Sequence, residues 1–286
     1  MRALVKVNLT LHVGAVRADG YHSVSSVCAF PAIGDEVTLA ERATRWTLSV
    51  EGPEAGALAG LPPTDNLAVR AARLLASQTA VPPRRIVLSK SVPAAAGIAG
   101  GTADAAAVLV LLNREAAEPL CDAALIRLSR HFGADGPVCT AARLAGGGLW
   151  LAEGDGARVR GLGPPPPLWG VLANDRTPVP TGAVFRAFDA GPPGTLPQPA
   201  ADLRTARGLA ALCQAGRNDL RAPALSLAPG IGAVEAAMRA QPGCRAARMS
   251  GSGGTVFGLF ADARGAEKAA RRMRGRGHWA ESGPLV

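Results

Sequence analysis

The stretch VPAAAGIAGGTADAAAVLVLLN, residues 92–113, decides the fold because it joins a glycine cluster to a long alanine-rich run. The run predicts a helix that begins near Thr102. The first N–H groups of a helix lack helical partners, and the helix dipole is positive at that end, so anions are favoured there. Because Gly97, Gly100 and Gly101 let a phosphate approach the backbone closely, the stretch is a competent phosphate site.

The glycine pattern alone leaves two interpretations open. It lacks the lysine of a GxxxxGK[ST] phosphate loop, and its GxxGG spacing differs from the dinucleotide pattern GxGxxG. The glycines could therefore form a tight turn that packs the helix closely on a sheet. The hydroxyl of Thr102 could cap the helix, meet a phosphate oxygen or help to bind a magnesium ion.

The segments around this stretch predict an α+β protein. Residues 5–13 alternate between apolar and polar, which predicts one strand with Lys6 and Asn8 on the same face. Residues 85–88, RIVL, predict a strand that leads into Lys90, and the segment at residues 62–78 predicts a helix capped near Thr64 or Asp65. Strands and helices do not alternate regularly enough for a doubly wound sheet.

A run of four prolines predicts where the chain divides. Residues 164–167 can continue neither a helix nor a central strand, so we expect a domain junction there. A length of 286 residues suits two packed domains, which we expect at residues 1–160 and 161–286.

Composition excludes several classes of protein. Hydrophobic residues make up 48% and charged residues 19%, which excludes disorder, and no secretory signal or membrane-length apolar run is visible, so we expect a cytoplasmic protein. The five cysteines form no CxxC pair, and the four histidines show no metal-binding spacing, so we expect no structural zinc.

The net charge of +9 raises the question of a polyanionic partner. Of the 31 basic residues, only Lys6, Lys90 and Lys268 are lysines. The arginines are spread along the chain without interleaved aromatic residues, which makes a dedicated nucleic-acid groove the weaker interpretation. An anionic small substrate remains open.

Seven ordered motifs together resemble the GHMP kinase family, and most closely its branch of diphosphocytidyl-methylerythritol kinases in the non-mevalonate isoprenoid pathway. They are VKVNLTLHVG, RADGYH, DNLAVRAARLL, KSVPAAAGIAGGTADAAAVLVLLN, GADGP, NDL and ARMSGSGGTVFGLF. The resemblance implies a two-domain GHMP kinase fold of the α+β class. Its N-terminal domain would be ribosomal protein S5 domain 2-like, and its C-terminal domain would be a ferredoxin-like α/β plait.

The resemblance also implies a reaction: ATP-dependent phosphorylation of the 2-hydroxyl of 4-diphosphocytidyl-2-C-methyl-D-erythritol, with ATP and Mg²⁺ as cofactors. Phosphoryl transfer needs positioning and charge neutralisation more than covalent participation by the protein. Thr102 is the one candidate ligand for the metal. The residues that the resemblance places at ATP are Asn66, Lys90, Pro93, Ala94, Ala95, Ala96, Gly97, Ile98, Ala99, Gly100, Gly101, Thr102 and Ala103.

Two residues are the candidates for catalysis. Lys6 would supply a cation near the transferred phosphoryl group. Asp135, in GADGP, would accept the proton of the substrate hydroxyl, and Lys6 would keep it ionised if the two lie side by side. Asp104 is the rival carboxylate, but a place in the first turn of a helix would explain its charge through the helix dipole.

The substrate residues implied by the resemblance lie mainly near the N-terminus. Asn8 would contact the bound alcohol together with Asp135, and Tyr21 and His22 would contact the cytosine, with Phe185 as a second stacking face. The partners would be small molecules, with no nucleic acid and no membrane, and the protein would be a monomer or a homodimer.

Some positions depart from the family pattern. Leu4 and Val5 stand where Pro-Ala is usual, Val138 and Cys139 follow GADGP where an aromatic residue is usual, and Gly254 replaces a proline. A GHMP kinase that acts on a different alcohol is therefore the nearest alternative. A basic RNA-binding protein without catalytic activity is a more distant one.

Overall fold

The computed structural model describes residues 1–18, 20, 22–188 and 202–286, and their contacts form two compact units. The units are built from segments that are not contiguous in sequence. Unit 1 comprises Met1–Val5, Ile33–Ala94 and Ala99–Gly146. Unit 2 comprises Lys6–Ala32, Ala95–Ile98 and Gly147–Val286.

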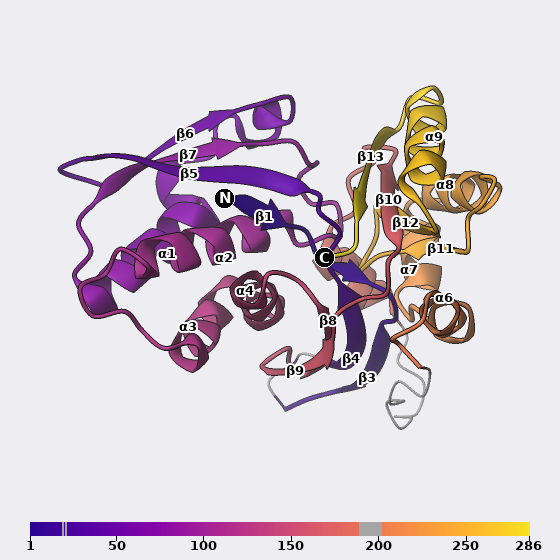
Figure 1. The fold of residues 1–286 in the computed structure, drawn as a ribbon, viewed down its shortest axis with the longest axis horizontal. Helices are drawn as coiled ribbons and strands as arrows, with labels where there is room; N and C mark the ends of the chain where they lie inside the picture. Colours follow the sequence, from indigo (N-terminus) through magenta and orange to yellow (C-terminus); the bar gives the residue numbers. More distant parts are fainter. Residues whose placement is uncertain (19, 21, 189–201) are drawn as a thin grey trace. The chain divides into compact units, whose positions relative to one another are not determined.

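Unit 1 combines one four-stranded sheet with a group of helices (Figure 1). The strand order is β1-β5-β7-β6, in which only the β6–β7 pair is parallel. The strands are β1 (Arg2–Leu4), β5 (Gly34–Arg42), β6 (Thr47–Glu51) and β7 (Arg84–Ser89). The helices are α1 (Leu67–Thr79), α2 (Gly100–Asn113), α3 (Asp122–Leu128) and α4 (Gly136–Ala145), with 3₁₀ turns at Ala55–Leu58, Pro63–Asp65 and Ser129–Phe132.

Helix α2 forms the centre of unit 1. Ten of its fourteen residues are buried, and it contacts α1, α4, β1 and β5. Its small alanine side chains allow this close packing on several sides. The helix begins at Gly100, two residues before the predicted start at Thr102.

The start of α1 differs from the sequence prediction as well. The cap is Asn66, whose side chain accepts a hydrogen bond from the Ala68 N–H at 2.9 Å. Thr64 and Asp65, which we expected to cap the helix, belong to the preceding 3₁₀ turn. All three residue types can cap a helix, so composition could not select among neighbours.

Unit 2 contains two sheets. In the first, β2-β4-β8-β9 are paired in that order and β3 pairs with β4; the second has the order β11-β12-β10-β13 and is antiparallel throughout. The first comprises β2 (Val7–Asn8), β3 (His12–Val16), β4 (His22–Ala29), β8 (Leu149–Gly154) and β9 (Arg158–Gly163). The second comprises β10 (Trp169–Asn174), β11 (Ala246–Met249), β12 (Thr255–Phe260) and β13 (Trp279–Pro284).

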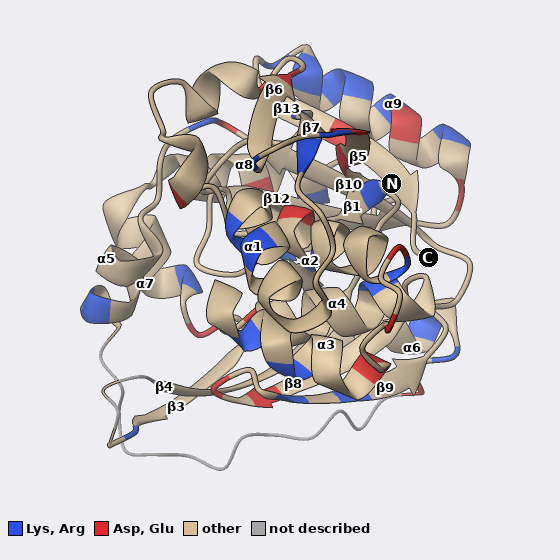
Figure 2. Cartoon of the chain, turned by 90° about the vertical axis from the view of Figure 1, so that its left-hand side faces the viewer, with Lys and Arg blue, Asp and Glu red and all other residues tan. Residues whose placement is uncertain are grey.

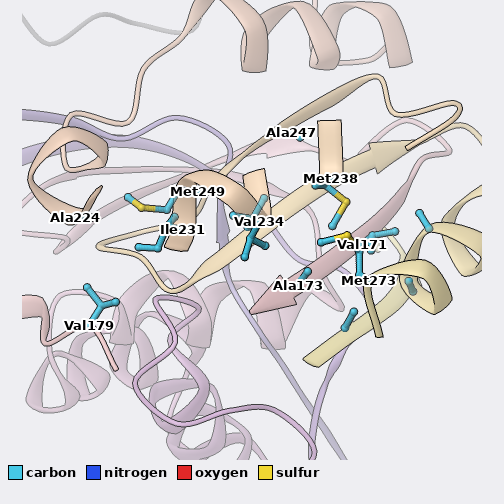
Figure 3. Packing of buried hydrophobic residues seen from close by; sticks show 14 of the residues in the cluster. Val171, Ala173, Val179, Ala224, Ile231, Val234, Met238, Ala247, Met249 and Met273 are labelled. Atoms are coloured by element: carbon cyan, nitrogen blue, oxygen red, sulfur yellow. The ribbon is translucent and has the colours of Figure 1, made fainter. Parts of the chain in front are cut away.

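Helices cover the second sheet of unit 2. They are α5 (Thr181–Ala187), α6 (Ala206–Ala215), α7 (Arg221–Leu227), α8 (Gly230–Arg239) and α9 (Ala263–Arg274). Val234 and Met238 of α8 and Met273 of α9 pack against Val171 and Ala173 of β10 in one apolar core (Figure 3). Burial of such side chains is the main force that holds the helices on the sheet.

Helix α9 carries many basic residues, whose positions on the ribbon are blue in Figure 2. Ala266, Ala269, Ala270 and Met273 face the core, and the basic side chains lie on the other face. The exposed basic residues of α9 are Arg264, Lys268, Arg271, Arg272 and Arg274. The apolar spacing of a surface helix accounts for this distribution without a nucleic-acid partner.

The prediction of one strand over residues 5–13 is wrong. Strand β1 pairs with β5 and ends at Leu4, whereas β2 pairs with β4, so the chain changes sheets in between. The Val5 N–H donates to the Ile33 carbonyl at 3.0 Å and the Lys6 N–H to the Ile98 carbonyl at 3.1 Å. Residues 3–12 are all buried, including the polar ones, so the apolar alternation does not mark a strand with one solvent-exposed face.

The predicted domain boundary at residues 160 and 161 stays a prediction. The four prolines connect β9 to β10, and both strands belong to unit 2. Among the described residues, no helix is both long and apolar enough to cross a membrane.

His12 gives unit 2 a pH dependence that can be measured. Its ring is buried, and burial lowers its pKa from 6.5; Arg217 and Arg248 lower it further, whereas Asp219 opposes the shift. His12 therefore binds a proton more readily in the unfolded chain than in the folded one. Its contribution to the free energy of unfolding is complete above pH 6.5 and is lost as the pH falls. We expect the free energy of unfolding, measured by urea titration, to fall less between pH 7.5 and pH 5.5 in His12→Phe than in the wild type. Equal losses in the two proteins would exclude this role.

Candidate active site

The glycine loop between β7 and α2 has an alternating backbone. Ala95, Gly97 and Ala99 have φ of 52°, 71° and 53°, whereas Ala96 and Ile98 do not have positive φ. Such alternation directs successive N–H groups into one concave anion-binding nest. Ala99 is also the residue that precedes the first turn of α2, so the helix N-terminus adds its own N–H groups.

The loop tip, residues 95–98, packs on the second Gly/Ser loop within unit 2. The Ser250 hydroxyl donates to the Gly97 carbonyl at 3.2 Å, and the Thr255 N–H donates to the Ala96 carbonyl at 3.1 Å. A Cβ on Gly251 would lie only 2.6 Å from the Gly97 carbonyl oxygen, so the backbones can approach this closely only with glycine. The two loops that the motifs singled out are therefore in direct contact.

The backbone at Gly254, in the second loop, has a conformation that proline cannot adopt. Its φ is +77°, whereas the ring of proline fixes φ near −65°.

The structure brings Lys6 and Asn8 to the same two loops. The Lys6 N–H holds the Ile98 carbonyl, and the Asn8 N–H donates to the Ser250 hydroxyl at 3.1 Å. The Asn8 side chain donates to the Ser26 hydroxyl at 2.7 Å, while its buried Oδ1 accepts no hydrogen bond from any described residue. An unsatisfied buried acceptor is costly, and a ligand hydroxyl could satisfy it.

The His22 ring contacts two aromatic side chains of unit 2. The ring centroids of His22 and Phe185 are 5.7 Å apart, and those of His22 and Phe188 are 5.5 Å apart with the rings edge to face. His22 Nδ1 lies 2.9 Å from the Gly14 carbonyl oxygen, so Nδ1 carries the hydrogen and Nε2 is an acceptor in the neutral ring. Tyr21 lies outside the described residues.

Asp135 lies in unit 1, at the position that precedes the first turn of α4. It is partly exposed, and its carboxylate makes no capping hydrogen bond to the helix. A Cβ on the next residue, Gly136, would lie 1.9 Å from the Ser129 carbonyl oxygen, so the GADGP turn requires glycine there. Helix α4 therefore begins directly after this carboxylate.

Asp104 has a different environment from the one that we predicted. It is the fifth residue of α2, beyond the first turn, so the helix dipole does not explain its charge. Its carboxylate is buried and lies 3.4 Å from the Lys90 ammonium, which also contacts Asp35. Burial raises the pKa of Asp104 to about 7, against the lowering effect of Lys90, and Asp35 raises it further. These contacts place Asp104 and Lys90 in one buried network.

Sequence reasoning missed three residues, which are Asp35 in unit 1 and Thr181 and Phe188 in unit 2. Asp35 precedes Lys90 by 55 residues, and no local pattern marks it. Thr181 and Ser252 share a hydrogen bond of 2.8 Å between their hydroxyls, and Ser252 belongs to a loop that the sequence did single out. Phe188 directly follows the last residue of α5, and no local sequence pattern marked it.

The close contact at Gly97 yields a direct prediction. A Cβ there would lie 2.4 Å from the Gly253 carbonyl oxygen, so we expect Gly97→Ala to displace the loop and weaken ATP binding by at least about tenfold. Gly243→Ala is the matched control, because Gly243 has φ of +81° but nothing within 4 Å of the added Cβ. Titration calorimetry measures both, and equal affinities would contradict the prediction.

Comparison with known proteins identifies the family. The GHMP kinases N terminal domain matches residues 66–143, and the GHMP kinases C terminal domain matches residues 199–278. The chain belongs to the GHMP kinase family. The two matches fall on either side of the proline run. As a GHMP kinase, this protein uses ATP.

Close relatives of this GHMP kinase are named 4-diphosphocytidyl-2-C-methyl-D-erythritol kinase. One, from Cereibacter sphaeroides, is 45% identical over 98% of this chain and 96% of its own. Another, from Methylobacterium radiotolerans, is 47% identical over 96% of this chain and 93% of its own. A crystal structure of 4-(cytidine 5'-diphospho)-2C-methyl-D-erythritol kinase is 33% identical, with a TM-score of 0.79 over 100% of this chain and 98% of that one.

These similarities confirm the predicted GHMP kinase fold of the α+β class. The distant alternative, an RNA-binding protein without catalytic activity, loses its support, because both halves of the chain match kinase domains. The roles of individual site residues stay predictions.

Proposed function

We propose that this GHMP kinase transfers the γ-phosphoryl group of ATP to the 2-hydroxyl of 4-diphosphocytidyl-2-C-methyl-D-erythritol. The observation that carries the proposal is His22, whose ring contacts Phe185 and Phe188 and whose Nδ1 donates to the Gly14 carbonyl, which leaves Nε2 as an acceptor in the neutral ring. The names of relatives at 45% and 47% identity support the same substrate. We place the reaction in the cytoplasm.

His22 suits a cytosine for a specific reason. The exocyclic amino group of cytosine is a donor and is complementary to an acceptor at His22 Nε2. The corresponding atom of uracil is a carbonyl oxygen, which would face that acceptor without a hydrogen bond. The neighbouring aromatic rings offer a stacking surface for either base, so the hydrogen bond supplies the discrimination.

Different residues of this chain have separate roles in the phosphoryl transfer. Asp135 takes the proton from the 2-hydroxyl of the substrate. At the same time, the oxygen of that hydroxyl bonds to the γ-phosphorus, and the bond between the γ-phosphorus and the departing ADP oxygen breaks. Lys6 supplies positive charge to the transferred group, and Asn8 Oδ1 orients the alcohol. The nest at residues 95–99 and the N-terminus of α2 bind the phosphates of ATP.

We propose that Mg²⁺ accompanies the nucleotide. No cluster of three or more His, Cys, Asp or Glu suited to a metal occurs among the described residues, so a metal held by protein alone does not fit. Mg²⁺ is commonly bound by substrate phosphates, water and one or two protein oxygens, and the half-buried Thr102 hydroxyl on the third residue of α2 fits that mode. When bound, the ion would neutralise charge on the phosphates.

A pair of substrates that differ only in the base tests the proposal. We expect the cytidine-linked alcohol to have a kcat/KM about 100-fold above that of its uridine counterpart, because uracil leaves the His22 acceptor unpaired. The product, identified by phosphorus NMR, should carry a new phosphate monoester on the 2-hydroxyl. Equal use of the two substrates, or phosphorylation elsewhere, would contradict the proposal.

A further inference from the structure

Three charged side chains are buried together in unit 1, beside the two ends of the glycine loop. Asp35 lies on β5, Lys90 follows β7, and Asp104 lies on α2. Their exposed fractions are 0%, 3% and 2%. The Lys90 ammonium contacts Asp35 Oδ2 and lies 3.4 Å from Asp104 Oδ2. One ammonium is thus shared by two carboxylates from different elements.

Asp35 fixes the first end of the loop. Its Oδ1 accepts hydrogen bonds from the Ser91 N–H at 2.6 Å and the Val92 N–H at 3.1 Å. The Ser91 hydroxyl donates to the Gly34 carbonyl at 2.9 Å, so β5 holds the loop start through side chain and backbone. Charge-assisted bonds of this kind are stronger than neutral ones and define direction as well as distance.

Lys90 and Asp104 connect the first end of the glycine loop to its second end, at the start of α2. Asp104 projects from the second turn of α2, and the Lys90 ammonium also lies 3.9 Å from the position that a Cβ on Gly100 would occupy. Gly100 is the first residue of the helix whose N-terminus faces the loop. The lysine therefore links the end of β7 to the start of α2.

Stability alone is a poor explanation for this network. Removing three charges from water is costly, and well-packed apolar side chains often replace buried ion pairs without loss. Asp104 Oδ1 has no hydrogen-bond partner among the described residues. Burial of Lys90 lowers its pKa, but the charges of Asp104 and Asp35 outweigh this and raise it, so the lysine stays charged.

We propose that Asp35, Lys90 and Asp104 are positioning residues for ATP, which hold both ends of the glycine loop so that its N–H groups are already directed at the phosphates. This inference rests on the proposed function of the loop. Lys90 then acts through the loop backbone and through α2, and its own ammonium does not contact the nucleotide. Preorganised donors bind charge without a cost of rearrangement, which is the advantage that the network provides.

Binding of Mg²⁺-ATP to the full chain, measured by calorimetry, tests the inference without any alcohol substrate. We expect Asp35→Ala and Asp104→Ala to weaken ATP binding about tenfold, since each cuts one connection of the network. Asp104→Asn keeps an oxygen acceptor for Lys90 and should remain within about threefold of the wild type. Hydrogen exchange should show faster exchange at Ser91 and Val92 in Asp35→Ala.

Leu75→Ala controls for a purely structural effect. Leu75 is a fully buried core residue of α1, and its truncation should lower Tm by several degrees while leaving ATP affinity unchanged. If the two alanine variants lower Tm but keep the wild-type affinity and exchange pattern, the inference is wrong. If they do not fold, Asp35→Asn decides: binding about threefold to tenfold weaker supports the inference, and unchanged binding overturns it.

The readouts separate this inference from the proposed function. A chain that binds ATP through the network but does not phosphorylate the cytidine substrate would refute the proposed function alone. A chain that phosphorylates this substrate while Asp35→Ala and Asp104→Ala bind ATP normally would refute the inference alone.

Discussion

Asp135→Asn is expected to lower kcat by about 10²- to 10⁴-fold while the Kd of ATP changes less than about threefold. The carboxamide has the shape of the carboxylate but cannot accept the proton of the 2-hydroxyl. Asparagine is also well suited to the position before a helix, so α4 should form as in the wild type. Steady-state kinetics with the cytidine substrate, together with calorimetry for ATP, measure the two effects.

Asp122→Asn is the matched control for this variant. Asp122 is an exposed acid at the first position of α3, and the same substitution there should leave both kcat and ATP affinity unchanged. The base assignment would be reversed if Asp135→Asn kept its kcat while Asp104→Asn lost it. The burial of Asp104 beside Lys90 argues for the expected order.

Lys6→Met is expected to lower kcat by about 10²- to 10³-fold, the usual effect of removing one group that stabilises transition-state charge. Methionine matches the length of the buried lysine stem and keeps its apolar contacts. The Lys6 N–H bond to Ile98 belongs to the backbone and is unaffected, so the loop tip should stay in place. Burst and steady-state measurements with saturating ATP would isolate the chemical step.

Lys268→Met controls for the loss of a positive charge elsewhere. Lys268 is exposed on α9, and its substitution should leave the kinetics as in the wild type. A Lys6→Met enzyme with a kcat within about threefold of the wild type would remove Lys6 from the catalytic mechanism.

The sequence predicted secondary structure well wherever one element buries one regular face. The strand predicted at residues 85–88 lies within β7 (Arg84–Ser89), and the helix predicted after Thr64 and Asp65 corresponds to α1 (Leu67–Thr79). The strand over residues 5–13 failed, because hydrogen-bond partners change at Val5 and Lys6 while the apolar alternation does not. Pairing partners are long-range information, which periodicity does not contain.

The candidate site was predictable in its motifs but not in its geometry. The glycine loop and the segment that contains Ser250 were both among the motifs of the sequence, and the structure brings them into contact. The positive φ of Ala95 and Ala99 could not be foreseen, because alanine disfavours that conformation. The partners of Asp104 were also hidden, since Asp35 and Lys90 reach it through folding rather than through spacing.

ADP release by the purified protein with Mg²⁺-ATP, across a panel of alcohols, tests the central claim most directly. The panel contains diphosphocytidyl-methylerythritol, homoserine, mevalonate and simple sugars. We predict that kcat/KM for the cytidine substrate exceeds that for every other alcohol by about 10³-fold or more. No turnover of the cytidine substrate, or faster turnover of another alcohol in the panel, would contradict the proposed function.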